Sequence, residues 1–271
     1  MFGIVWMFVV LCATYVIVMR TPLGQIDTQW RNLYMYVWAN WDGGHYTSIA
    51  SKGYEIVQYA FFPLFPFLIK VVHHLIGEGH SYILAGLIVS RTALLVALVY
   101  LYKLFRLDYD ESQSQMSLFL LLAFPTSMFL LAVYTEPLFL ATSAASIYYA
   151  RKKNWAMAGG AAFLAGLTRT VGIALLFPLI YEFLKNIPAR TVSEQIGKAV
   201  RDWRFTFCFF SLVGVLVYAT YSYGQTGNFL QMLDSQKYWT EIANRGGEGI
   251  RSPIRAIRVG YEAIETFEVS P

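Results

Sequence analysis

The chain has 271 residues, of which 56% are hydrophobic and only 14% are charged, whereas an ordinary soluble domain carries about 25% charged residues. This composition excludes a disordered chain, a coiled coil and a disulfide-rich secreted module, and it predicts a membrane protein. The net charge of +4 is weak evidence for a nucleic-acid partner, and none is expected. The two cysteines, Cys12 and Cys208, lie in apolar runs, so we expect neither a disulfide nor a metal site from them.

Hydrophobic runs predict seven membrane-spanning helices, because a bilayer requires about 20 apolar residues per crossing. The first run, about residues 2–19, carries no charge and lacks the basic start of a signal peptide. Residues 20–80 are polar, aromatic and broken by proline and glycine, which predicts a long loop containing short interfacial helices, one of them at Phe61–Ile76. The other expected spans are about 82–104, 116–133, 137–150, 155–167, 171–184 and 205–223.

Basic residues indicate how these spans are oriented. Ten of them crowd the short loops at 103–106, 151–153 and 185–204, which places those loops on the cytoplasmic side; Arg20, just outside the first span, argues against this orientation. The 20–80 loop, the turns at 134–136 and 168–170, and residues 224–271 then share the non-cytoplasmic side. We therefore expect an all-α polytopic membrane module at 1–223, followed by a non-cytoplasmic C-terminal segment at 224–271.

The segment around Asp42 is the most informative part of the long loop. Asp42 precedes two glycines, which allow the backbone to approach a ligand closely. His45 could orient that carboxylate or bind a sugar or a phosphate, and Trp41 offers a flat face for a sugar ring or a lipid. A turn at the membrane interface with aromatic anchors fits the same pattern.

Two further charged residues lie at the ends of expected spans, on the same side as Asp42. Glu136 is followed by Pro137, a pattern typical of a helix start, so a structural role competes with a functional one. Arg169 separates two apolar runs, and a cation near the membrane pairs with an anion or lines a cavity. A phosphate suits its guanidinium, and so does a lipid headgroup. Arg91 lies inside an expected span and has no evident partner in the sequence.

Motifs for nucleotides and metals are missing from the sequence. There is no phosphate-binding glycine loop of the P-loop type and no His-Glu-x-x-His. The adjacent His73 and His74 would point apart on a helix and make a poor metal pair. We therefore expect no metal and no cofactor.

Taken together, these motifs resemble the GPI mannosyltransferase 2 (PIG-V-like) family of the GT-C superfamily, which contains polytopic membrane glycosyltransferases. The resemblance covers about residues 30–255 and rests on the following segments: Trp41-Asp42-Gly43-Gly44-His45-Tyr46, Gly53-Tyr54, Phe61-Phe62-Pro63-Leu64-Phe65-Pro66, Tyr134-Thr135-Glu136, Gly166-Leu167-Thr168-Arg169-Thr170-Val171-Gly172, and a looser Gln236, Trp239 and Pro253. Val171 replaces the family's asparagine, and the chain ends after the seventh expected span, whereas the family continues. We expect a truncated or minimal microbial member.

This resemblance implies an inverting mannosyltransferase in the plasma membrane of a prokaryote or the endoplasmic reticulum membrane of a eukaryote. Its donor would be a polyprenyl- or dolichyl-phosphate-linked sugar, and its acceptor a hydroxyl of a glycolipid or glycan at the non-cytoplasmic face. The implied roles are a catalytic base for Asp42, donor-phosphate binding for Arg169 and His45, and substrate binding for Trp41, Glu55, Glu136 and Tyr134.

Two other functions are left open by the sequence. A transporter or lipid flippase would carry ionisable groups near the middle of the membrane, where only Arg91 is found. A non-catalytic assembly subunit would tolerate the combined loss of Asp42, Glu136 and Arg169. The polar groups gather on one side of the predicted membrane, which favours chemistry at that surface.

Overall fold

The computed structural model describes residues 38–77, 79 and 81–245, with side chains to residue 241. Within this part of the chain every regular element is helical. The α-helices are α3 (Asp42–Lys52), α4 (Leu64–Ile76), α5 (Tyr82–Phe105), α6 (Glu111–Ala123), α7 (Glu136–Arg151), α8 (Trp155–Gly166), α9 (Leu176–Lys185), α10 (Val192–Arg201), α11 (Phe210–Thr226) and α12 (Gln231–Arg245). Short 3₁₀ segments are η2 (Ile56–Ala60), η3 (Pro125–Leu130), η4 (Thr170–Leu175) and η5 (Trp203–Phe209).

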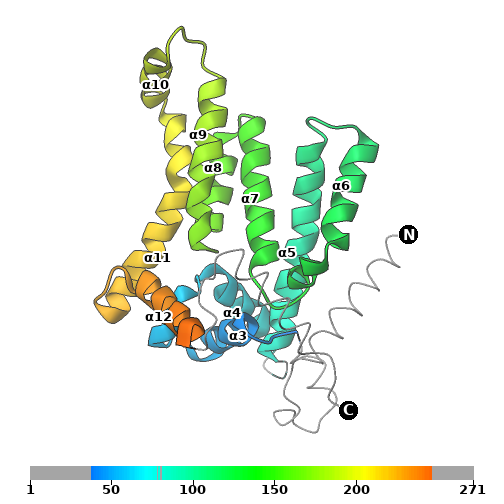
Figure 1. Cartoon of the computed structure of the whole chain (residues 1–271), viewed down its shortest axis with the longest axis vertical. Coiled ribbons are helices and arrows are strands. Elements are labelled where there is room, and N and C mark those ends of the chain that lie inside the picture. Colours follow the sequence, from blue (N-terminus) through cyan, green and yellow to red (C-terminus); the bar gives the residue numbers. More distant parts are fainter. Residues whose placement is uncertain (1–37, 78, 80, 246–271) are drawn as a thin grey trace.

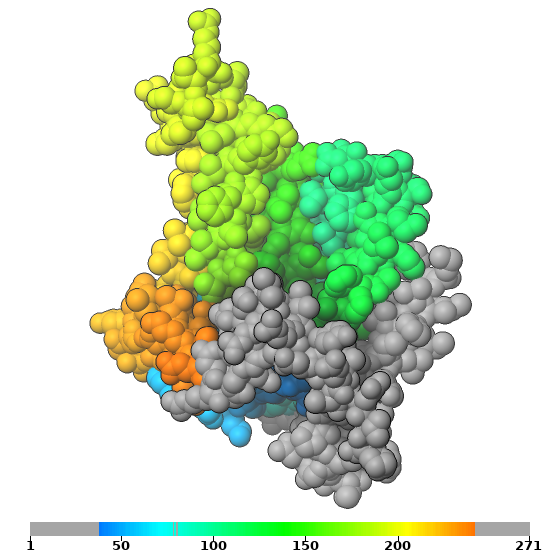
Figure 2. Space-filling model, in the orientation of Figure 1, coloured from blue at the N-terminus to red at the C-terminus, as the bar shows by residue number. Residues whose placement is uncertain are grey.

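The long helices form a bundle with two different ends. Helices α5 to α9 and α11 run side by side, with α7 packed between α5 and α8 and with α11 packed on α8 (Figure 1). Helices α3, α4 and α12 gather at one end, which we call the α3 end. Helix α10 lies at the opposite end, the α10 end, where the α9–α10 segment projects past the neighbouring helices (Figure 2).

Two helical stretches are long and apolar enough to cross a membrane within the described residues. They are Tyr82–Phe105 and Trp203–Thr226, each of 24 residues. The first begins at a Ser81 cap, whose hydroxyl accepts a hydrogen bond from the Leu84 N–H at 3.2 Å. These two stretches correspond to the expected spans at 82–104 and 205–223, and the expected span at 2–19 lies outside the described residues.

The structure differs from the expected pattern in two places. The run 116–133 is not one helix, because α6 ends at Ala123 and Phe124 is extended before η3 starts. Pro125 explains this break, since proline disfavours a helical conformation in the residue before it and cannot donate a backbone hydrogen bond. The run 171–184 is likewise divided, into η4 and α9. The seven-span prediction is therefore supported only for the two long helices.

Two glycines bring α8 and α11 unusually close together. A Cβ atom placed on Gly166 would lie 2.1 Å from the carbonyl oxygen of Ser211, and one placed on Gly214 would lie 2.3 Å from that of Phe163. Only a residue without a side chain fits at such crossings. This contact fixes the end of α8 and therefore the turn that carries Arg169.

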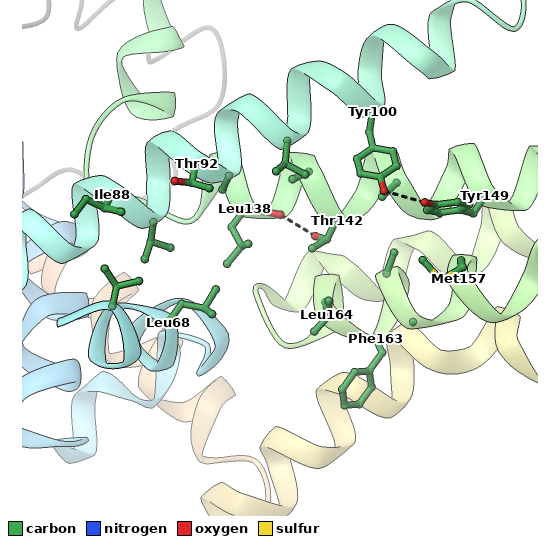
Figure 3. Close-up of a pocket in the computed structure, with 18 of the residues that line it drawn as sticks. Leu68, Ile88, Thr92, Tyr100, Leu138, Thr142, Tyr149, Met157, Phe163 and Leu164 are labelled. Carbon is green, nitrogen blue, oxygen red and sulfur yellow. Dashed lines mark hydrogen bonds between the residues drawn. The ribbon is translucent and has the colours of Figure 1, made fainter. Parts of the chain in front are cut away.

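An apolar cavity of about 700 Å³ lies between α4, α5, α7 and α8 (Figure 3). Its walls include Leu68, Ile88, Leu138 and Leu164, while the hydroxyls of Tyr100 and Tyr149 are joined by a 2.9 Å hydrogen bond. Among the residues that the structure describes, no acidic or basic side chain lines this cavity.

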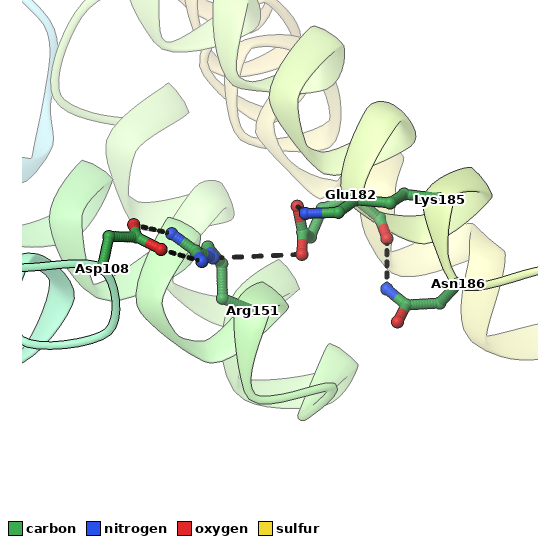
Figure 4. Close-up of polar contacts among 5 residues, drawn as sticks. All are labelled: Asp108, Arg151, Glu182, Lys185 and Asn186. Atoms are coloured by element: carbon green, nitrogen blue, oxygen red, sulfur yellow. Dashed lines mark hydrogen bonds and ion pairs between the residues drawn. The ribbon is translucent and has the colours of Figure 1, made fainter.

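The α10 end is held by an ion-pair cluster. Arg151 binds both carboxylate oxygens of Asp108, with 2.7 Å between its Nη2 and Oδ1, and its Nε lies 4.0 Å from Glu182 (Figure 4). Lys185 lies 3.7 Å from the same Glu182. Asp110, two residues from Asp108, caps α6 by accepting the Gln113 N–H at 2.8 Å. Both aspartates thus make structural contacts at this end.

Candidate active site

A second, polar cavity of about 870 Å³ opens at the α3 end. Its walls combine charged, aromatic and hydroxyl side chains from the long loop, from the turn after α8 and from α12. The lining residues are Trp41, Asp42, His45, Tyr46, Ala60, Phe61, Phe62, Thr168, Arg169, Thr170, Val171, Gln236, Trp239 and Thr240. A concave site with a few converging polar groups is typical of a ligand site.

Backbone contacts hold the start of α3 against the segment before α7. The Val133 N–H donates to the Trp38 carbonyl at 2.9 Å, and the Tyr134 hydroxyl donates to the Asn40 carbonyl at 3.0 Å. A Cβ atom on Gly43 would lie 3.1 Å from the Val133 carbonyl oxygen, so glycine allows this close approach. These contacts explain how Asp42 comes near Glu136, which is distant in sequence.

Trp41 has an unusual backbone conformation beside the cavity. Its φ is 52°, in the left-handed region that residues other than glycine rarely adopt. The residue is 55% exposed although it lines the cavity. Strain of this kind costs about 1–3 kcal/mol and is concentrated at functional sites, where it holds a side chain in a required position.

Arg169 forms an ion pair across the end of the bundle. Its Nη1 lies 2.5 Å from Glu136 Oε1 and also donates to the Thr135 hydroxyl at 3.2 Å. The Tyr46 hydroxyl lies 3.4 Å from the same Thr135 hydroxyl. Within the described residues Arg169 Nε and Nη2 have no partner, so the outer edge of the guanidinium can bind a ligand. Glu136 Oε2 is buried and also lacks a hydrogen-bond partner there.

The electrostatic environment favours a basic Asp42. Burial raises the pKa of Asp42 above its usual value, and the negative charge of Glu136 raises it further, while His45 and Arg169 lower it in part. Burial works against the charge on Arg169, but Glu136 more than offsets this and raises the pKa of Arg169. Burial also raises the pKa of Tyr46, which keeps its hydroxyl protonated as a hydrogen-bond donor.

Gln58 and two aromatic rings fix the orientation of His45. The Gln58 Oε1 accepts the Glu55 N–H at 3.0 Å, which leaves its Nε2 as the donor toward His45 Nδ1 at 3.4 Å. A neutral His45 then carries its proton on Nε2. The ring stacks on Phe61 at 4.8 Å between centroids and meets Trp239 edge-on at 4.9 Å.

Helix α12 completes the wall of the cavity. The Trp239 indole N–H donates to the Val57 carbonyl at 2.9 Å, and the Gln236 side-chain amide donates to the Thr170 hydroxyl at 3.3 Å. Helix α12, in the segment beyond residue 223, therefore contributes part of this site. No three histidine, cysteine, aspartate or glutamate side chains in residues 38–77, 79 and 81–241 are placed to share a metal ion.

The residues proposed from the sequence fall into two groups. Asp42, Arg169, His45 and Trp41 line the cavity, whereas the other three do not. Glu136 contacts the cavity through Arg169, Tyr134 is buried with its hydroxyl bound to Asn40, and Glu55 is exposed at the start of η2.

Sequence reasoning assigned no role to Tyr46, Gln58 or Thr135. Tyr46 could have been found, because it lies four residues after Asp42 and so on the same face of α3. Thr135 lies within the Tyr134-Thr135-Glu136 motif, but its contacts with Tyr46 and Arg169 depend on folding. Gln58 carries no comparable signal, because its role depends on its contact with His45 in the folded chain.

Comparison with known proteins identifies one family. The sequence model of the mannosyltransferase (PIG-V) family matches residues 10–232, which is most of the chain. No curated protein and no solved structure is significantly similar to the chain. The matched range includes all seven residues proposed from the sequence, and it contains the start of α12 as well.

Proposed function

Because the chain belongs to the PIG-V family of mannosyltransferases, we propose that it takes mannose from a polyprenyl- or dolichyl-phosphate donor. The acceptor is a hydroxyl group of a glycolipid or glycan. The observation that carries this proposal is the placement of Asp42 and Arg169 on the wall of one cavity at the α3 end. The carboxylate of Asp42 can accept a proton from an acceptor hydroxyl, and the guanidinium of Arg169 can bind a phosphate.

The reaction is an inverting displacement at the anomeric carbon. The acceptor hydroxyl attacks this carbon while Asp42 removes its proton, and the bond between the carbon and the phosphate oxygen breaks. The bonding electrons leave with the lipid phosphate, whose growing negative charge is stabilised by Arg169. A positioned base contributes about 10²–10⁴-fold to the rate. The raised pKa of Asp42 strengthens it as a base.

The remaining side chains orient the donor. His45 donates from Nε2 to the phosphate, and Trp41 provides an apolar face for the sugar ring. Glu136 acts as a positioning residue, since its carboxylate holds Nη1 of Arg169 and leaves the outer edge of the guanidinium for the phosphate. Two parallel hydrogen bonds from a guanidinium match the geometry of a phosphate.

We also propose that the α3 end faces the non-cytoplasmic side. The support is the concentration of basic residues at the α10 end, in the loops at 103–106, 151–153 and 185–204. A membrane-impermeant thiol reagent applied to sealed vesicles of known orientation tests this with the exposed position Glu55→Cys. Labelling from the cytoplasmic side would contradict it.

The donor class is tested with purified protein and a panel of sugars. The panel contains polyprenyl-phosphate mannose, polyprenyl-phosphate glucose and a nucleotide-linked mannose, each supplied with a glycolipid acceptor. We expect free polyprenyl phosphate to be released with the lipid-linked mannose, in equal amount to mannosylated acceptor. Turnover of the nucleotide-linked mannose with no release of lipid phosphate would refute the proposal.

A further inference from the structure

Helix α10 carries an exposed apolar face at the α10 end. Val192, Ile196 and Val200 are spaced four residues apart, so they lie along one side of the helix, and all three are exposed. Trp203, two residues after the end of the helix, is 70% exposed. Isolated exposed apolar residues are ordinary, but a continuous row of them indicates an interaction surface.

The orientation of this face is fixed by contacts on another side of α10. Ala199 is fully buried, and the Gln195 side-chain amide donates to the carbonyls of Leu184 at 2.7 Å and Ile187 at 3.3 Å. Lys198 Nζ donates to the Pro188 carbonyl at 2.9 Å. These hydrogen bonds attach α10 to the end of α9, so the apolar row cannot turn inward.

The chain places α10 at a membrane surface. The apolar stretch Trp203–Thr226 is long enough to cross a bilayer, and it begins two residues after Arg201, the last residue of α10. The start of a membrane-spanning helix lies at the interface between lipid and water, where tryptophan is enriched. Helix α10 therefore lies at the level of the lipid headgroups.

The net positive charge of the segment around α10 favours anionic lipids. Residues 185–204 contain five basic and two acidic residues. Both acidic side chains are paired with basic neighbours, Glu194 with Lys198 at 2.7 Å and Asp202 with Arg204 at 2.5 Å. Within the described residues the guanidinium groups of Arg190 and Arg201 have no acidic partner, so they are available to bind anionic headgroups.

We propose that α10 is an interfacial helix that binds the anionic phospholipids of its leaflet. Val192, Ile196 and Val200 lie among the upper acyl chains, while Arg190 and Arg201 contact phosphate groups. An amphipathic helix with basic residues and an apolar face adopts this placement. The proposal concerns membrane attachment and does not depend on the transferase reaction.

The depth of α10 can be measured with spin labels on the whole chain. One label is attached at Ile196→Cys and a matched control at Lys198→Cys, which lies about 200° away around the helix. Both variants carry Cys12→Ser and Cys208→Ala, and each is reconstituted in phosphatidylcholine vesicles with and without phosphatidylglycerol. Accessibility to oxygen, which dissolves in lipid, is compared with accessibility to a water-soluble nickel complex.

With phosphatidylglycerol present, the label at 196 should react mainly with oxygen and the label at 198 mainly with nickel. Adding Arg190→Gln and Arg201→Gln should lower the equilibrium constant for insertion of the α10 face into the membrane by roughly fivefold per arginine. Each basic residue near an anionic surface contributes about this factor to membrane binding. Equal nickel accessibility at 196 and 198 would overturn the proposal, because it would show that the apolar face of α10 does not lie in lipid. Burial at 196 that is unchanged without phosphatidylglycerol would overturn the role of anionic lipid.

Discussion

Replacing Arg169 by lysine tests the proposed contact between this residue and the donor phosphate. Lysine keeps the positive charge beside Glu136, so the ion pair is retained while the flat guanidinium is lost. In the structure Nη1 is occupied by Glu136 and Thr135. Nε and Nη2 are then the atoms that donate to the departing phosphate in the proposed reaction. A lysine that pairs with Glu136 offers a single point of contact in their place.

The expected decrease in kcat/KM follows from the loss of one charge-assisted hydrogen bond to the phosphate. Such a bond contributes about 1.5–3 kcal/mol, which corresponds to a decrease of about 10- to 150-fold in kcat/KM. The free energy of unfolding should change by less than about 1 kcal/mol, since both partners are more than a third exposed and water screens the pair.

The assay is kcat/KM for mannosyl transfer from polyprenyl-phosphate mannose, with thermal unfolding measured on the same samples. Arg204→Lys serves as the matched control, because Arg204 also pairs with a carboxylate, that of Asp202, but lies at the α10 end. If Arg169→Lys keeps kcat/KM within threefold of the original chain, the two-donor account of phosphate binding is refuted.

Three other variants give distinct expected results. In the proposed reaction Asp42 acts as a base only when it is deprotonated, so activity should fall as the pH drops through its pKa. Glu136 raises this pKa and Arg169 lowers it, so Glu136→Gln should move the acidic limb of the kcat/KM profile to lower pH and Arg169→Gln should move it to higher pH. A shift of both limbs in one direction would contradict these charge effects. Gly166→Ala should destabilise the chain by about 1–3 kcal/mol or more, as measured by thermal unfolding, because its Cβ would lie 2.1 Å from the Ser211 oxygen. Its control, Gly160→Ala, lies in open space on the same helix and should stabilise by up to about 1 kcal/mol; equal effects at the two positions would exclude the close crossing. Gln58→Leu should leave His45 as a mixture of tautomers in nitrogen NMR spectra, and an unchanged Nε2–H form would show that Gln58 does not fix the ring.

Several residues of this site could be predicted from the apolar runs and motifs of the sequence. The helix-terminal positions of Glu136 and Arg169 followed from the apolar runs that flank them, and the structure places both near Asp42 at the α3 end. Asp42 and Trp41 could be proposed because the glycines after Asp42 allow the backbone to approach a ligand closely and because tryptophan offers a flat face for a sugar ring. That Trp41, Asp42 and Arg169 line one cavity could not be predicted, because it follows from how the helices pack.

The finer contacts could not be predicted because they arise from packing between distant segments. The pairing of Glu136 with Arg169 joins residues 33 positions apart and depends on how α7 packs against α8. Tyr134 was expected to bind substrate, but its hydroxyl donates to the Asn40 carbonyl. No local sequence pattern predicts this contact. The break at Pro125 is different, since proline signals it in the sequence.

The central claim is that Asp42 is the base of the transfer reaction, and the single-turnover rate of Asp42→Asn tests it most directly. Polyprenyl-phosphate mannose is bound to excess enzyme, acceptor is added, and the rate of mannose transfer is measured together with donor affinity. Asp110→Asn is the control, because asparagine also caps a helix and Asp110 lies at the α10 end. We expect Asp42→Asn to keep its donor affinity and to lose about 10²–10⁴-fold in rate. A rate within threefold of the original chain would contradict the assignment.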